Sequence, residues 1–174
     1  MKAGLIVFLL ALFARFVNLL ILPLDVESYI FEDQRLYWGW SLKNAYLPWG
    51  EISKDLLSER MPGSFLFFEF LQWITNKSLF FILLFQSILD SFTCVVIYKC
   101  AYLINKKYSF YTGLFASFSP LLIIISSQIL SDTLFLFTFS LSLLYLLKYS
   151  KPNSSQYNIY LSGLMLGISC FIRA

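Results

Sequence analysis

The sequence predicts an all-α protein of the membrane, and two observations support this fold class. Hydrophobic residues make up 59% of the chain and charged residues only 13%, whereas soluble domains carry about a quarter charged residues. Apolar stretches recur at the lengths that spanning helices need, roughly 17–25 residues. Histidine is absent, which excludes Ser-His-Asp triads and histidine-based metal sites. A soluble core of this length could not bury so much apolar surface, so we expect lipid to cover it.

About five stretches are expected to cross the membrane. They are residues 4–22, 79–104, 110–130, 133–148 and 158–174. The first could be taken for a secretory signal peptide, but Arg15 interrupts its apolar run and no convincing A-x-A cleavage site follows it. We therefore predict an uncleaved anchor. Cys94, Cys100 and Cys170 fall inside apolar stretches without metal-ligand spacing, which indicates small buried residues rather than disulfides or a zinc site.

The distribution of charge predicts the side on which each loop lies, because cytoplasmic loops are enriched in Lys and Arg. With a cytoplasmic N-terminus, the first loop at 23–78 lies outside and the turns at 105–107 and 148–156 lie inside. The lysines then found on the cytoplasmic side, with no acid among them, are Lys2, Lys106, Lys107, Lys148 and Lys151. Most of the acidic residues lie in the first outer loop. We therefore expect a multi-pass protein whose N-terminus is cytoplasmic.

The outer loop at 23–78 is too long and too patterned to be a passive linker. Residues 32–47 have partly helical spacing and are rich in Trp and Tyr, which suit the headgroup region, so we predict a helix that lies on the outer leaflet. Glu32 and Asp33 would lie near its N-terminus, where the helix dipole favours carboxylates. A second interfacial helix is expected at 64–74, a stretch too short to span.

Two carboxylates stand out as candidates for chemistry at the outer face. Asp33 could act as a general base toward an acceptor hydroxyl or amine, and the alternative is an exposed acid at a helix N-terminus. Asp132 lies in a short outer turn, where acids that border spans tend to be functional. Its alternative role is the N-cap of the next span. The predicted topology brings both carboxylates to one side of the membrane.

Two arginines are candidates for binding phosphate at the same face. Arg60 stands before Pro62 and Gly63, and a guanidinium at the bilayer edge can form bidentate hydrogen bonds with phosphate oxygens. Ordinary attraction to lipid headgroups is the alternative. Arg173, at the far end of the last span, would approach the same face.

A further pair of charges falls inside the spans. Arg15 and Asp90 lie near the middle of the first and second spans, by helix rise. Each would be costly in lipid if it were unpaired. We therefore predict an interhelical ion pair between them, with a structural rather than a catalytic role.

Taken in order, these motifs resemble the GT-C superfamily of integral-membrane glycosyltransferases, in particular the branch of protein O-mannosyltransferases, the aminoarabinose transferase of lipid A and the Rgt-type lipopolysaccharide transferases. In that family a long outer loop opens with an Asp-Glu-x-x-Tyr-like motif. The stretch "DQRLY" is similar, with Asp33 on the motif Asp and Tyr37 close to the motif Tyr. Gln34 stands in place of the second acid, unless Glu32 substitutes for it.

The rest of the chain continues the resemblance. "RMPG" at 60–63 is similar to a basic residue that the family has before Pro-Pro or Pro-Gly, although Met61 replaces a common proline. "SPLLIIISSQILSDTLFLF" places Asp132 on an acidic position of the second outer loop. "LSGLMLGISCFIR" looks like the following span, which ends in a basic residue, here Arg173.

The resemblance implies inverting transfer of a sugar from a polyprenyl-phosphate donor to a glycan, lipid or protein acceptor, at the outer face of a bacterial plasma membrane. Asp33 would take the acceptor's proton and Asp132 would orient the acceptor or a nearby positive group. Arg60 and Arg173 would stabilise the departing phosphate. Further residues expected to contact the substrate are Tyr37, Arg35 and Glu32.

The resemblance leaves several points open. Some relatives use a divalent metal, which Asp33 and Asp132 permit without requiring, and no other cofactor is expected. Family members continue through further spans, so the 174 residues would correspond to an N-terminal part. A truncated or diverged module that binds isoprenoid lipid or a partner chain without catalysis is therefore the alternative to an enzyme. A transporter is less favoured, because no internal repeat is visible, and the expected partners include membrane lipids but no nucleic acid.

Overall fold

The computed structural model describes residues 2–23, 25–30, 33–35, 37–38, 61–152 and 154–173. Within these ranges the regular structure is entirely helical. The helices are α1 (Lys2–Ile21), α2 (Val26–Tyr29), α5 (Pro62–Ile74), α6 (Leu79–Ile104), α7 (Ser109–Ser117), α8 (Pro120–Ser126), α9 (Asp132–Tyr149) and α10 (Tyr157–Ile172). The predicted all-α fold class is confirmed.

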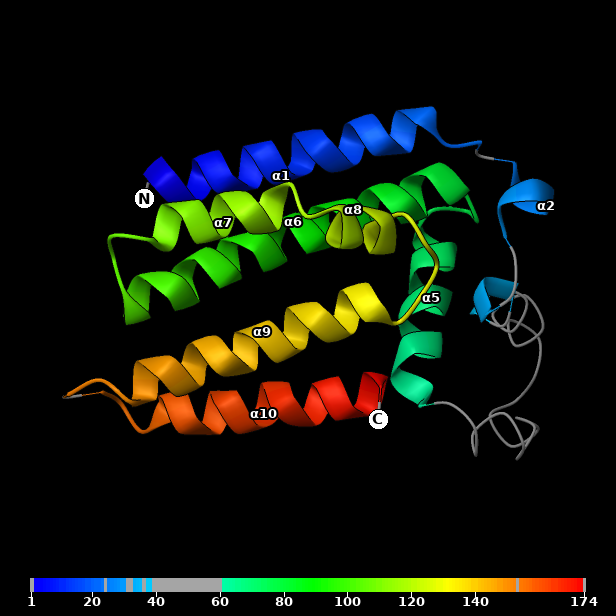
Figure 1. Ribbon diagram of the computed structural model, residues 1–174. Coiled ribbons are helices and arrows are strands. Elements are labelled where there is room, and N and C mark those ends of the chain that lie inside the picture. The colour runs from blue at the N-terminus through cyan, green and yellow to red at the C-terminus, as the bar shows by residue number, and fades with distance from the viewer. Residues whose placement is uncertain are drawn as a thin grey trace.

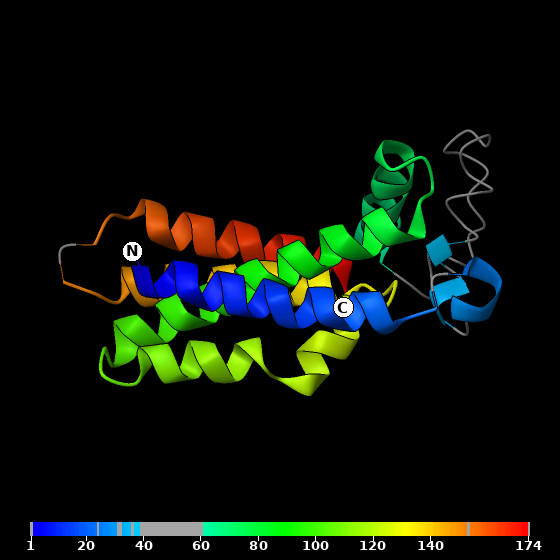
Figure 2. The ribbon, with the colours of Figure 1, turned by 90° about the horizontal axis from the view of Figure 1, so that it is seen from above.

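The long helices run roughly side by side as a bundle, and α5 crosses one end of it (Figure 1). Helix α2 lies at that same end, which we call the α5 end, while the N-terminus and the connection from α9 to α10 lie at the opposite end, the N-terminal end (Figures 1 and 2). The crossing helix α5 contains the predicted interfacial helix at 64–74. The other predicted interfacial helix, at 32–47, falls largely outside the described residues.

Helix lengths agree with a membrane-spanning bundle. Helices α1, α6 and α9 are each long and apolar enough to cross a membrane, α7 and α8 reach that length together, and α10 is a shorter apolar helix. A helix or helix pair therefore lies in each of the five ranges expected to span.

Burial follows the pattern that lipid imposes, with polar side chains inside and large apolar ones outside. On α6, Gln86, Ser87 and Asp90 are buried, whereas Phe85 and Phe92 are exposed. Interfaces between membrane helices favour small and polar residues, because outward-facing apolar side chains are already satisfied by lipid. The fold is that of an all-α membrane protein.

The third predicted span, 110–130, differs from the expectation of one continuous helix. Helices α7 and α8 meet at an angle of 51°, and Ser119 between them is extended, with φ −63° and ψ 117°. Pro120 is the cause, because its ring disfavours the helical conformation of the residue before it and it has no N–H to donate to the preceding turn. Residues 127–131 then form a turn before α9 begins.

Arg15 joins three helices in the interior of the bundle. Its Nε donates to Asp90 Oδ2 at 2.5 Å, and its Nη1 donates to the carbonyl oxygens of Ala11 and Ser117, each at 3.0 Å. Its Nη2 lies 3.3 Å from Cys94 Sγ. The side chains of Arg15 and Asp90 are fully buried. The guanidinium therefore has a counter-ion on α6 and also satisfies a carbonyl at the end of α7, next to the break at Pro120.

The end of α10 packs against the start of α5 through Gly63. A Cβ atom at this position would lie 2.7 Å from the main-chain oxygen of Phe171, which is closer than real Cβ atoms approach. Gly63→Ala is therefore expected to destabilise the protein by about 1–3 kcal/mol, as overpacking typically does. The measurement is the midpoint of thermal unfolding of the detergent-solubilised protein.

Gly167→Ala is the matched control for this prediction. Gly167 is also a helical glycine, on α10, but a Cβ there would meet nothing within 4 Å. The control should be neutral or slightly stabilising, because Ala has the higher helix propensity. Equal midpoints for the two variants would contradict the close approach of α5 and α10.

Candidate active site

The segment that follows α1 is held against the turn at 127–131. The Tyr29 hydroxyl donates to the carbonyl oxygen of Ser127, and the N–H of Ile129 donates to Gln34 Oε1 at 3.1 Å. Gln34 is only 3% exposed. Burial raises the pKa of Tyr29 by more than its hydrogen bond to Ser127 lowers it, so its hydroxyl stays a proton donor. We call residues 29, 30, 33–35 and 37, which these contacts hold at the turn at 127–131, the docked segment.

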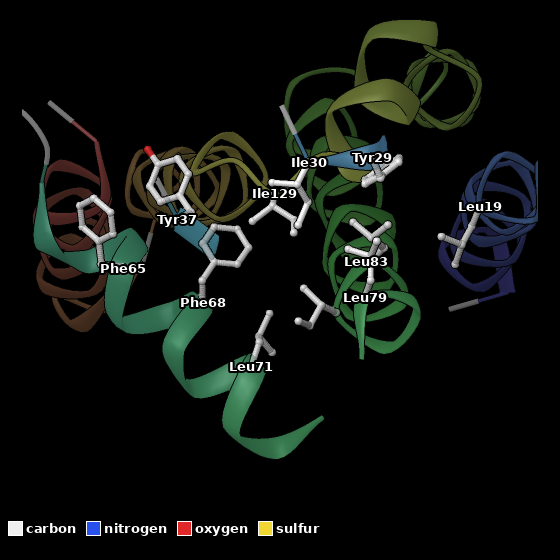
Figure 3. Close-up of a cluster of buried hydrophobic side chains, with 11 residues drawn as sticks. Leu19, Tyr29, Ile30, Tyr37, Phe65, Phe68, Leu71, Leu79, Leu83 and Ile129 are labelled. Carbon is white, nitrogen blue, oxygen red and sulfur yellow. The ribbon is translucent and has the colours of Figure 1, made fainter. Parts of the chain in front are cut away.

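A second contact anchors the docked segment to α5. Tyr37 is 3% exposed, its hydroxyl lies 3.4 Å from Ser131 Oγ, and its ring packs on Phe65 and Phe68 with centroids 5.1 and 5.5 Å away. Figure 3 shows this ring among the buried side chains that join α5, α6 and the 127–131 turn, Ile129 included. Tyr37, expected to contact substrate, is thus part of the packed support in this structure.

Asp33 lies on the docked segment with its side chain exposed. The next residue, Gln34, is buried in the contact with the turn, so the two neighbours face different surroundings. Arg35 is also exposed, and its Nε donates to the carbonyl oxygen of Ile30 at 3.2 Å. The segment therefore presents a carboxylate and a guanidinium at the α5 end, and the contact of Gln34 with the turn holds its backbone in place.

Asp132 and Arg173 form an ion pair at the same end. Asp132 is the first residue of α9, and its Oδ1 accepts a hydrogen bond from Nη1 of Arg173, just beyond α10. Their side chains are 27% and 49% exposed, so the pair remains open to a ligand. Ser131, rather than Asp132, occupies the N-cap position, which differs from the N-cap alternative raised by the sequence.

The structure thus brings some of the predicted site residues together, and others lie outside the residues that it describes. Asp132 directly contacts Arg173, and the docked segment carries Asp33 and Arg35 to the turn that leads into Asp132. Arg60 and Glu32 lie outside the described residues. The contacts that sequence reasoning missed are those of Tyr29 and Gln34, whose partners are 98 and 95 residues away. The only signal was Gln34 itself, which stands where the resemblance expects an acid.

The described side chains do not by themselves make a metal centre. In the ranges that the structure covers, no group of three or more His, Cys, Asp or Glu side chains is close enough to hold an ion. The carboxylate of Asp132 is already paired with a guanidinium.

Gln34→Leu tests the docked segment directly. The substitution leaves the buried N–H of Ile129 without its acceptor, at a cost of about 1–3 kcal/mol. We expect faster hydrogen exchange across the 127–131 turn, measured by mass spectrometry on the detergent-solubilised protein. Asp33→Asn is the control, because the exposed side chain before Gln34 can change without removing this acceptor. Unchanged exchange in Gln34→Leu would contradict the docking.

One family of known proteins matches most of the chain. The family described as dolichyl-phosphate-mannose-protein mannosyltransferase matches residues 59–174, about two thirds of the chain. The match includes Asp132 and Arg173 and begins after the docked segment that carries Asp33. No curated protein and no solved structure matches the chain. The chain belongs to the dolichyl-phosphate-mannose-protein mannosyltransferase family, and it is a membrane glycosyltransferase of the GT-C type.

Proposed function

We propose that this protein transfers a sugar from a polyprenyl-phosphate donor to an acceptor, with inversion, at the α5 end of its helix bundle. The family assignment supports the class of reaction. The observation that carries the location is the docked segment, because Gln34, the neighbour of exposed Asp33, is bound to the turn that leads to the Asp132 and Arg173 pair. A base and a cation at one surface are what such a transfer requires.

The chemistry is a single displacement at the anomeric carbon of the sugar. An acceptor hydroxyl or amine attacks this carbon and forms the new glycosidic bond, while the bond to the phosphate oxygen breaks and its electron pair leaves with the polyprenyl phosphate. Asp33 takes the proton of the acceptor. Attack opposite the leaving group inverts the configuration.

The remaining residues position groups or stabilise charge. Arg173 faces the negative charge that develops on the phosphate, and Asp132 holds this guanidinium in place. Arg60 would supply a second cation, with bidentate hydrogen bonds to phosphate oxygens. Tyr37 acts through packing, since its ring supports the segment from which Arg35 reaches toward substrate. Glu32, next to Asp33 in sequence, is proposed to contact the acceptor.

We further propose that the α5 end faces away from the cytoplasm, in the plasma membrane. The N-terminus and the α5 end lie at opposite ends of the bundle (Figure 1). Lys106, Lys107 and Lys151 belong to the turns of the N-terminal end, and Lys148 belongs to the last turn of α9 at that end. Lys-rich loops favour the cytoplasmic side. This orientation brings the candidate site to a lipid-linked donor whose headgroup lies in the outer leaflet.

A transfer assay with membranes that contain this protein tests the proposal. Labelled polyprenyl-phosphate hexoses and pentoses are supplied with membrane acceptors, and the anomeric configuration of the product is compared with that of the donor by NMR. Transfer with inversion is expected. Retention of configuration would exclude the single displacement. Binding of the donor lipid without transfer, for every sugar and acceptor tried, would instead favour a non-catalytic module.

A further inference from the structure

A cavity of about 440 Å³ opens at the N-terminal end of the bundle, far along the helices from the candidate site. It lies where α1, α6 and α9 meet, and its lining includes Gly4, Tyr98, Lys99, Tyr102, Leu144 and Lys148. Its volume falls in the range of about 300–1,000 Å³ that small-molecule sites occupy. The proposed transfer reaction uses none of these residues.

The mouth of this cavity is positively charged. Lys99 comes from the end of α6 and Lys148 from the last turn of α9, and both side chains are exposed. The ammonium of Lys148 lies 4.9 Å from the ring centroid of Tyr145, which helps to fix its position. Among the described residues, no acidic side chain lines the cavity and neither lysine takes part in an ion pair. The site therefore offers two cations to an anion.

The interior of the cavity is apolar and closely built. Leu144 is 5% exposed and forms part of the lining, and the rings of Tyr98 and Tyr102 lie one helical turn apart with centroids separated by 6.2 Å. Gly4 of α1 lies beside this wall, and a Cβ there would be in ordinary van der Waals contact with the ring of Tyr98, at 3.6 Å. Charge at the mouth and hydrocarbon within suit an amphipathic ligand.

We propose that this cavity binds the phosphate headgroup of an anionic membrane lipid. The ammonium groups of Lys99 and Lys148 attract the phosphate. The side chain of Leu144 and the rings of Tyr98 and Tyr102 cover the first methylene groups of the lipid. Its position at the ends of spanning helices is the level at which lipid headgroups lie, and basic pockets between such helices commonly take acidic lipids. A soluble phosphate ester shares the headgroup chemistry but not the apolar part, which favours the lipid.

The test compares two double variants of the full chain that each lose two positive charges at the same end. Lys99→Gln with Lys148→Gln removes the cavity's cations, whereas Lys107→Gln with Lys151→Gln removes lysines that do not line it. Binding of phosphatidylglycerol, against phosphatidylcholine, is measured by native mass spectrometry of protein released from mixed micelles. One lysine near an anionic surface accounts for about a fivefold change in affinity. The affinity of the cavity variant for phosphatidylglycerol should therefore fall at least about fivefold further than that of the control variant.

Two results would overturn the proposal. Equal losses in both double variants, or no loss in either, would mean that any selectivity comes from general charge at this end rather than from the cavity. Displacement of phosphatidylglycerol by millimolar glycerol 3-phosphate would assign the cavity to a soluble phosphate ester. Retained selectivity in Lys99→Arg with Lys148→Arg would support the lipid site, because that variant keeps both charges. None of these measurements depends on the transferase activity, so the proposal stands or fails separately from it.

Discussion

Asp33→Asn is expected to lower the rate of sugar transfer about 10²- to 10⁴-fold, the contribution that a general base typically makes. Asparagine keeps the size of the side chain but cannot take the acceptor's proton. Asparagine also keeps a side-chain oxygen that accepts hydrogen bonds, and the buried Gln34 that fixes the segment is unchanged, so we expect the fold to be preserved. The measurement is the initial rate of transfer from a polyprenyl-phosphate sugar at saturating donor.

Two comparisons separate loss of chemistry from loss of structure in this variant. Glu69→Gln removes one negative charge from α5, at the same end of the bundle, and should keep nearly full activity. Donor binding and hydrogen exchange in the 127–131 turn should be unchanged in Asp33→Asn. A normal transfer rate in Asp33→Asn would remove this carboxylate from the mechanism, and an equal loss in Glu69→Gln would reduce its effect to one of net charge.

The second large effect is expected at the buried ion pair. Asp90→Asn leaves the guanidinium of Arg15 in the interior without its counter-ion, and breaking a buried pair in this way costs about 3–5 kcal/mol. The hydrogen bonds of Arg15 to the carbonyl oxygens of Ala11 and Ser117 remain possible, but they do not neutralise its charge. When the solubilised protein is titrated with a denaturing detergent, the variant should unfold at a clearly lower concentration of that detergent than the unchanged protein.

A double-mutant cycle shows whether the two residues depend on each other. In an Arg15→Leu background, Asp90→Asn should cost much less, because the carboxylate has already lost its partner. Ser91→Ala is the control on the same helix, since the Ser91 hydroxyl donates to the carbonyl oxygen of Ser87 one turn earlier, within its own helix. If Asp90→Asn is equally harmful with and without Arg15, the pairing does not account for the stability of this region.

The general architecture could be predicted because lipid leaves few solutions for an apolar chain. Any stretch of this length must satisfy its backbone internally, so hydrophobicity alone indicates helices. The cost of an isolated charge in lipid likewise pointed to a partner for Arg15, and the structure has Asp90 beside it. The break at Pro120 could have been read from the proline, but hydropathy treats 110–130 as a single run.

The site was harder to predict because it depends on contacts between distant residues. Nothing in the sequence near Gln34 specifies that its side chain accepts a hydrogen bond from Ile129, since polar side chains find partners only when the helices have packed. The position of Lys99 in a cavity could not be predicted for a related reason. It lies within an apolar helix, whereas the side of the membrane on which a segment lies is predicted from lysines in loops. In the structure it lines a cavity together with Lys148.

The bonds of Arg15 also bear on how the protein is assembled during synthesis. Asp90 follows Arg15 by 75 residues and Ser117 follows it by 102. Translation proceeds at about 5–20 residues per second, so about 4–15 s pass before the carboxylate is made. The first helix can enter the bilayer in that interval, because its apolar residues offset an arginine cost of about 2.5–3.5 kcal/mol. We expect its final depth and rotation to be fixed only when α6 and α7, which supply these partners, lie beside it.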